Sequence, residues 1–291
     1  MFGYEFFEMM WGRPRRTDNP IRTEFKFTDI EDFYKSALSF DTTTGNRDQY
    51  LEILHNRNPE WVGMTLSDIE KYKYSYAPGV PHLEQIKEDL LIPATSSFKT
   101  KWDDVDGEDM SMERLYDELP FMSKRVRKHG FLNGKFVKLY IDISENSHVE
   151  YTDMLHKTYT AVSIVDYLES MGYRTEVYAT AKTISLGRRK GEDVEQAYVE
   201  IPVKKLDESL NTSLLLTLLS PWAFRFWILL LYSANVYTSY GMGRASYEKP
   251  ETTLGTLYIN TGDCLTKESS EHFINQIKTM YDQDFQEDVY K

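Results

Sequence analysis

The order of apolar and polar positions divides the chain into a helical first part and a second part in which strands and helices alternate. Near the start, apolar residues recur at the spacing of one helix face: Ile30, Phe33, Tyr34, Ala37 and Leu38. Segments 47–56 and 81–91 show a similar amphipathic pattern. We therefore expect residues 1–100 to form a helical N-terminal region.

The second part predicts an α/β core over residues 101–291. Apolar and β-branched residues predict strands at 135–144, 174–183, 197–206 and 253–263, and Pro202 places the third at a sheet edge or a strand end. Helical spacing predicts helices at 151–173, closed by Gly172, and at 267–285. Alternating strands and helices indicate a mostly parallel sheet flanked by helices.

One apolar run, residues 214–234, has the length of a membrane span. Arg225 lies in its middle, at a cost of about 2.5–3.5 kcal/mol on membrane insertion scales, and Pro221 interrupts it. We therefore expect a buried helix pair and no membrane partner.

Composition and charge narrow the cellular compartment and the kinds of partner that we expect for the protein. The formal net charge is −12, so any nucleic-acid contact requires a local basic patch. The single cysteine, Cys264, excludes an intramolecular disulfide and fits a reducing compartment. The first residues place apolar before basic positions, the reverse of a secretory signal. A cytoplasmic location is the expectation, and the 21 tyrosines suit either interfaces or a half-buried core boundary.

Basic residues nevertheless gather in three short clusters. The two nearest the core are Lys124, Arg125, Arg127 and Lys128, and Arg188, Arg189 and Lys190; a third, Arg13, Arg15 and Arg16, lies beside Trp11. Cations hold backbone phosphates, and aromatic rings stack on the bases of single strands. The clusters are therefore candidate nucleic-acid contacts, with solvated loops as the alternative.

Motifs for enzymatic chemistry are missing. The acidic segment 98–110 lacks the glycine and glutamate spacing of a calcium loop, which leaves a solvated loop as its interpretation. No phosphate-binding loop or complete dinucleotide fingerprint occurs, and the histidines have no metal-site spacing. Cys264 has no evident histidine partner, so a structural role is favoured over a nucleophile.

Several segments together carry a family resemblance. They are "FYKSAL", "WDDVDGEDMSMERLYDELPFMSKR", "VKLYIDISENSHVEYTDMLHKTYTAVSIVDYLESMGYRTEVYA", "IPVKKLDESLNTSLLLTLLSPWAFRFW" and "YGMGRA". In this order, over about residues 25–260, the chain resembles a phage and bacterial family of unknown function with a von Willebrand factor A-like core.

The resemblance implies a candidate metal site. In such a core an Asp-x-Ser-x-Ser motif follows the first strand and helps to hold Mg²⁺ with a threonine and an aspartate from other loops. Asp142 and Ser144 match this motif, Asn146 replaces its second serine, and Asp263 is a candidate for the distant carboxylate, with Thr261 beside it. The alternative is that Asp142 and Ser144 cap the next helix or brace the sheet edge.

The chain also looks like proteins of schitoviruses, where a single-stranded-DNA-binding middle transcription factor recruits the phage's heterodimeric RNA polymerase. This implies a non-enzymatic adaptor in the cytoplasm of an infected bacterium, with single-stranded DNA and a phage RNA polymerase as partners and no required cofactor. The alternatives are a Mg²⁺-dependent A-type protein-binding module and a protein-only adaptor without DNA binding.

Overall fold

The main body is built on one mixed sheet. A computed structural model describes residues 21–43, 45–56, 58–89, 98–103, 109–117, 119–127, 135–185, 195–235, 244–245 and 249–289. The strands of the main sheet are β1 (Ile21–Lys26), β5 (Phe136–Asp142), β6 (Arg174–Ser185), β7 (Glu195–Lys204), β8 (Arg244–Ala245) and β9 (Thr256–Ile259). They run in the order β1-β7-β6-β5-β9, and β8 pairs with the far end of β6.

The predicted α/β class with a mostly parallel sheet is confirmed. β5 is parallel to both β6 and β9, and β1 is parallel to β7. Only the β6–β7 and β6–β8 pairs are antiparallel. Helix α8 (Tyr151–Ser170) connects β5 to β6 and ends at Gly172, whose φ of 93° suits a residue without a side chain.

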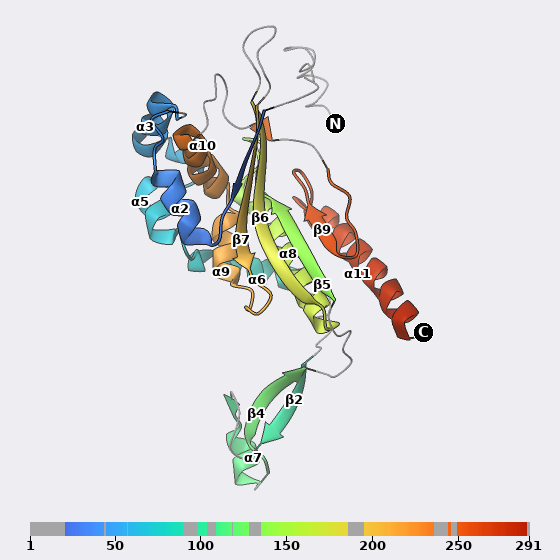
Figure 1. Cartoon of the computed structure of the whole chain (residues 1–291). Helices are drawn as coiled ribbons and strands as arrows, with labels where there is room; N and C mark the ends of the chain where they lie inside the picture. Colours follow the sequence, from blue (N-terminus) through green and yellow to red (C-terminus); the bar gives the residue numbers. More distant parts are fainter. Residues whose placement is uncertain are drawn as a thin grey trace.

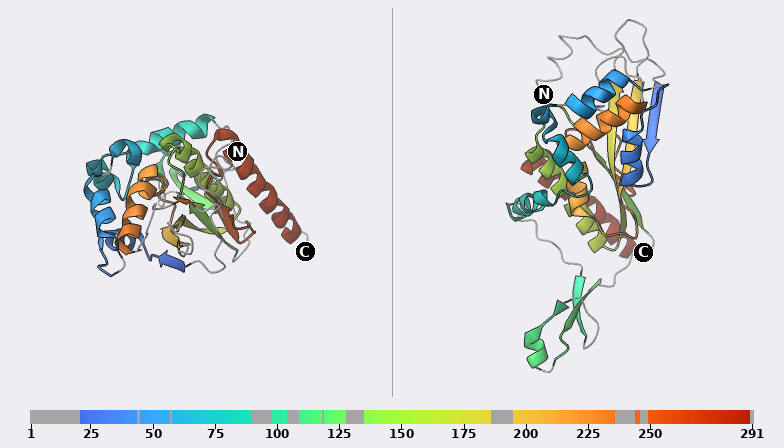
Figure 2. Two further views of the ribbon diagram at one scale, coloured as in Figure 1. Left: turned by 90° about the horizontal axis from the view of Figure 1, so that it is seen from above. Right: turned by 90° about the vertical axis from the view of Figure 1, so that its left-hand side faces the viewer.

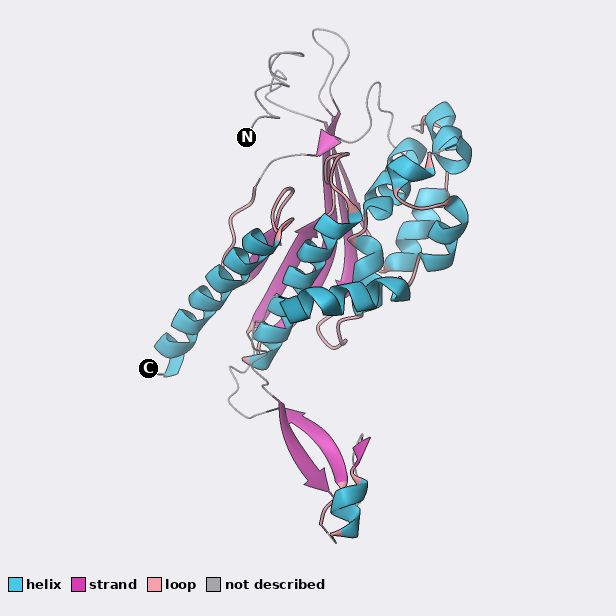
Figure 3. Cartoon of the chain, turned by 180° about the vertical axis from the view of Figure 1, so that it is seen from behind, coloured by secondary structure: helices cyan, strands magenta, loops and turns pink. Residues whose placement is uncertain are grey.

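Helices cover one face of this sheet. Figure 1 views the sheet from the face that no described helix covers, and Figure 3 shows α8 and other helices in front of the opposite face. Val137, Leu139 and Ile141 on β5 are buried, and Lys138 between them is exposed. Other helices of the body include α2 (Ile30–Leu38), α3 (Arg47–Asn56), α4 (Pro59–Val62), α5 (Leu66–Tyr72), η1 (Ala77–Gly79), α6 (Val80–Asp89) and α11 (Lys267–Val289).

The N-terminal region differs from the helical prediction at its start. Residues 21–26 form β1, a short strand whose pairing with β7 needs a partner far along the chain. This pairing makes β7 an internal strand up to Glu200, where the backbone N–H of Phe27 donates to the carbonyl of Glu200 (3.1 Å). Pro202 lies beyond the end of β1, so its missing N–H breaks no ladder bond on that side. The top view in Figure 2 shows β1 at the margin of the sheet.

The apolar run forms the centre of the core. It folds into α9 (Thr212–Leu218), a π-helical turn η2 (Ala223–Ile228) and α10 (Leu229–Asn235), and the predicted burial is confirmed. Among the described residues, no single helix is long and apolar enough to cross a membrane. One pair, Thr212–Leu218 with Ala223–Asn235, passes that test by length and composition, and it is bent by 56°.

A second, three-stranded sheet comprises β2 (Phe98–Asp103), β3 (Asp109–Met110) and β4 (Met122–Arg127), with helix α7 (Met112–Tyr116) between β3 and β4. β4 is central and antiparallel to both neighbours. The interpretation of 98–110 as one solvated loop is therefore wrong for 98–103 and 109–110. Pairing with β4, which the local pattern did not reveal, turns these segments into strands.

Arg225, the charged residue within the apolar run, holds helix α4 and the β5–α8 loop to the core. Its guanidinium donates to the carbonyls of Trp61 (2.8 Å), Ser147 (3.0 Å) and Val149 (2.6 Å), and lies 5.7 Å from the centre of the Trp61 ring. The side chain is thus buried and fully engaged with backbone oxygen atoms. The positions of α4 and of the β5–α8 loop therefore depend on Arg225, which lies in the π-helical turn.

Replacing Arg225 by Met should lower the free energy of unfolding by about 2–4 kcal/mol, because buried carbonyls lose their donors. Arg225→Lys should recover only part of this loss, since an ammonium cannot reproduce the planar fork. Urea unfolding checks both variants, with exposed Arg47→Met as the matched control. Equal stability of Arg225→Met and Arg47→Met would contradict the assigned role.

Candidate functional site

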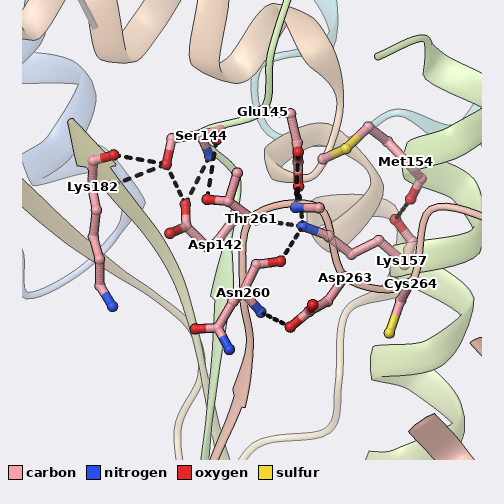
Figure 4. A network of polar contacts seen from close by, with 12 residues as sticks. Asp142, Ser144, Glu145, Met154, Lys157, Lys182, Asn260, Thr261, Asp263 and Cys264 are labelled. Atoms are coloured by element: carbon pink, nitrogen blue, oxygen red, sulfur yellow. Dashed lines mark hydrogen bonds and ion pairs between the residues drawn. The ribbon is translucent and has the colours of Figure 1, made fainter. Parts of the chain in front are cut away.

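The ends of β5 and β9 meet at one edge of the main sheet. In open α/β sheets, ligands bind beyond the carboxyl ends of the strands. The usual place is the point where the connections from two neighbouring strands lead in opposite directions across the sheet. Here α8 leads from β5 to β6 on one side, and β9 pairs with β5 on the other. Figure 4 shows the polar residues at this edge: Asp142, Ser144 and Glu145 after β5, Lys157 on α8, and Asn260, Thr261 and Asp263 after β9.

Asp142 and Ser144, the two residues that match the motif, bond to each other. The Ser144 backbone N–H donates to Asp142 Oδ1 (2.9 Å), and the Ser144 hydroxyl also donates to Oδ1. Ser144 Oγ in turn accepts from the backbone N–H of Lys182 (3.1 Å), which ties the end of β5 to β6. Burial raises the pKa of Asp142 to about 6, although the Ser144 hydrogen bonds and the nearby Lys157 charge act in the opposite direction.

A buried lysine occupies the centre of the edge. Lys157 Nζ donates to the carbonyls of Asp142 (2.9 Å) and Asn260 (3.0 Å) and forms an ion pair with Glu145 Oε1. The Lys157 side chain is fully buried, and the Glu145 side chain is 6% exposed. One ammonium therefore joins β5, β9 and α8, with an oxygen acceptor for each of its three protons.

Glu145 has a second set of partners in the loop after β9. The backbone N–H of Gly262 donates to Oε1 (3.0 Å) and Oε2 (3.1 Å) of Glu145. Gly262 has a φ of 76°, a left-handed conformation that a residue without a side chain adopts at little cost. The Thr261 hydroxyl donates to the carbonyl of Ser144 (3.3 Å), so the two loops are joined at several points.

The other residues of the predicted metal set point to other partners. Asp263 Oδ1 accepts from Lys249 Nζ (2.6 Å), and Oδ2 accepts from the backbone N–H of Asn260 (3.0 Å). The carbonyl of Asn146 accepts from Arg225 (3.4 Å). Within the described ranges, no three or more His, Cys, Asp or Glu side chains are grouped to hold a metal ion. The side chains of Asp142, Ser144 and Asp263 thus each accept a hydrogen bond from a protein donor, and the Mg²⁺ site stays a sequence prediction.

Most of the polar side chains of this edge are buried within the described part of the chain. Asp142, Ser144, Glu145, Lys157 and Thr261 are all buried. The cavity beside them, lined by Ile143, Glu145, Val149, Met154, Pro221, Phe224 and Arg225, measures about 10 Å³, which is roughly the space for one water molecule.

Cys264 follows the same loop and is also buried. Burial raises the pKa of its thiol to about 12, so the thiolate needed of a nucleophile is not formed at neutral pH. The structural interpretation of this cysteine is the one that its surroundings favour.

The predicted basic residues lie elsewhere. Lys124, Arg125 and Arg127 are on β4 of the small sheet, opposite Lys101, Thr100 and Phe98 of β2. Lys128, Arg188, Arg189 and Lys190 fall outside the described residues, as do Arg13, Arg15 and Arg16. The structure therefore adds a pairing partner for the first cluster, and the other residues stay sequence predictions.

Sequence reasoning missed Lys157, Glu145 and Gly262. The signal for Lys157 was present in the helical spacing, because it lies three residues after buried Met154 and four before buried Ala161. A lysine at such a position requires a buried acceptor. The residues around Lys157 did not indicate which groups would supply this acceptor. The loop after β9 lies more than a hundred residues from Glu145, and only the folded chain brings the two together beside Lys157.

Comparison with known proteins places the chain in one family. A family model described as a domain of unknown function, DUF7192, matches residues 16–284. No curated protein and no solved structure matches the chain.

Asp142→Asn should stabilise the protein at pH 7, by up to about 3 kcal/mol. The folded-state pKa of Asp142 is raised above the unfolded value, so the folded protein binds the extra proton and loses stability as the pH rises from about 4 to 6. Asparagine removes this loss and keeps an acceptor for Ser144. Urea unfolding at pH 4 and pH 7 tests the difference, with exposed Glu251→Gln as control. A destabilised Asp142→Asn at pH 7 would show that the ionised carboxylate is required.

Lys157→Met should lower the free energy of unfolding by about 3–5 kcal/mol, because it leaves Glu145 as a buried charge without its partner. The double variant Lys157→Met/Glu145→Gln should recover part of the loss.

Millimolar Mg²⁺ should leave the thermal midpoint of the unmodified protein unchanged in calorimetry. A Mg²⁺-dependent rise that Asp142→Ala abolishes would instead establish a metal site.

Proposed function

Because the chain belongs to the DUF7192 family, which has no described function, we propose a function from its own residues. The protein is a non-enzymatic adaptor that binds single-stranded DNA through its small sheet and recruits a phage RNA polymerase. The observation that carries the DNA part is the pairing of β2 with β4, which places Lys101 opposite Lys124 and so brings basic residues of two separate segments into one sheet.

The small sheet concentrates the residue types that single strands need. β2 contributes Lys99 and Lys101, and the central strand β4 contributes Lys124, Arg125 and Arg127. Phe98 and Trp102 stand at register positions opposite Arg127 and Ser123. Cations attract backbone phosphates and aromatic residues stack on bases, and the net charge of −12 makes a local basic sheet the place for such contact.

The main body supports binding over catalysis. Its ligand-binding edge is filled by Lys157 and its partners, and the adjacent cavity holds about 10 Å³. The position of Asp142 and Ser144 at the end of β5, which is parallel to both of its neighbours, supports our proposal of an A-type core. In our proposal this core is a metal-independent scaffold, since an internal ammonium supplies the positive charge.

The recruitment of a phage RNA polymerase and the setting in an infected bacterium rest on the family resemblance of the sequence segments. A DNA-binding sheet joined to a larger α/β body suits an adaptor, because one part can hold the promoter strand while the other holds a protein.

Charge reversal of Lys124, Arg125 and Arg127 together should weaken binding to a labelled oligonucleotide at least tenfold. The slope of log affinity against log salt should fall by about 2, since each lost phosphate contact on a single strand removes about 0.7. Fluorescence anisotropy across a salt series measures both quantities, with single-stranded and duplex DNA compared.

The matched control reverses three exposed basic residues of the main body, Lys35, Arg47 and Lys205, which gives the same net charge. This control should retain binding within about threefold. An equal loss in both triple variants would show that only overall charge matters. No binding of the unmodified protein at low salt would leave the second candidate, a protein-only adaptor, for which the uncovered face of the main sheet is the supporting observation.

A further inference from the structure

One face of the main sheet has no helix over it among the described residues. Figure 1 looks directly onto this face, and the helices lie on the far side that Figure 3 presents. Sheets with mostly parallel strands are normally covered on both faces. The uncovered face is therefore the part of the main body where a partner is structurally expected.

A row of tyrosines crosses the centre of this face. Tyr258, Tyr140 and Tyr178 stand opposite one another on β9, β5 and β6. The Tyr140 ring is stacked on Tyr178 (centroids 5.1 Å apart) and on Tyr258 (5.3 Å). All three side chains are half-buried, so a partner can reach the rings while neighbouring side chains hold them in place. Large rigid rings with polar tips are the residues that dominate protein interfaces.

The ring geometry disfavours nucleic acid as the occupant. The Tyr140 ring has a neighbouring ring on each side, at interplanar angles of 18° and 15°. Lysines lie over the outer rings, Lys138 at 5.9 Å from Tyr178 and Lys182 at 5.7 Å from Tyr258. A base needs a free ring face for stacking, and this row presents its ring edges.

Two carboxylates beside the row favour a cationic partner. Glu176 accepts from the Tyr178 hydroxyl (3.1 Å) and is paired with Lys138 (3.3 Å). Glu200 accepts from the Tyr198 hydroxyl (2.9 Å) and has no lysine or arginine partner within the described part of the chain. Lys26, its register neighbour on β1, pairs with Glu24 instead (3.6 Å). Glu200 is thus a half-buried anion with a bonded tyrosine and an open side.

We propose that this surface, defined by Tyr140, Tyr178, Tyr198, Tyr258, Glu176 and Glu200, docks a protein partner through an arginine-bearing segment. The planar guanidinium forms paired hydrogen bonds with the Glu200 carboxylate, which an ammonium cannot match, and the methylene stem of the arginine packs against the tyrosine edges. The inference supplies the protein-binding side of the proposed adaptor and is independent of DNA binding by the small sheet.

The test uses the full chain and a fluorescein-labelled peptide of alternating glycine and arginine. Its matched probe replaces each arginine by citrulline, which keeps the shape and removes the charge. Anisotropy should show binding of the arginine peptide alone. Glu200→Gln should weaken it about tenfold, as expected for loss of a charged hydrogen-bonded pair. Tyr140→Leu should weaken it about threefold, because the arginine stem loses the apolar surface of one ring edge.

Two controls separate a site from general attraction to an acidic protein. Glu52→Gln removes an equal charge from the exposed side of α3, and Tyr140→Phe keeps the stacked ring; both should bind the peptide within twofold of the unmodified protein. Thermal unfolding of each variant confirms that it is folded.

Equal losses in Glu52→Gln and Glu200→Gln would overturn the proposal, because the attraction would then be non-specific. Loss of single-stranded DNA binding in Tyr140→Leu would also overturn it and assign the face to nucleic acid. Retained DNA binding in Glu200→Gln together with lost peptide binding would support two separate surfaces. Failure of DNA binding in the unmodified protein would leave the peptide result interpretable on its own.

Discussion

The buried ammonium of Lys157 is the constraint on which the sheet edge depends. Moving a lysine charge out of water costs several kcal/mol unless acceptors surround it. The carbonyls of Asp142 and Asn260 and the carboxylate of Glu145 meet this requirement, and they come from two segments, the end of β5 with its following loop and the loop after β9. The ends of β5 and β9 are therefore held at fixed positions relative to α8, and Gly262 adopts the left-handed conformation that lets its N–H reach Glu145.

The same principle recurs elsewhere in the main body. Lys204, at the end of β7, is buried and donates to the carbonyl of Thr175 (2.7 Å) while pairing with Glu169 (2.8 Å). Arg225 satisfies carbonyls of α4 and of the β5–α8 loop. Three buried cations thus fasten loops and strand ends, where the sheet ladder and helices leave backbone oxygen atoms without donors.

In the function that we propose, recognition falls to the outer surfaces, because Lys157 occupies the edge where open α/β sheets usually bind ligands. Two such surfaces are chemically unlike: a small basic sheet with aromatic residues, and a tyrosine face with carboxylates. In this proposed function, their opposite charge preferences let one adaptor hold an anionic polymer and a cationic protein segment at the same time.

The sequence by itself determined the elements whose signal is local. The helical spacing from Ile30, the strand before Asp142, the long helix closed at Gly172 and the burial of the apolar run follow from periodicity and from residues with special backbone preferences. The α/β class follows from their alternation. Tertiary structure decided what depends on distant partners. Residues 21–26 and 98–103 became strands because β7 and β4 pair with them. The Asp142–Ser144 motif lies beside an internal ammonium because α8 carries Lys157 to the end of β5. The uncovered tyrosine face exists because the helices gather on one side of the sheet, and no short window of residues encodes that choice.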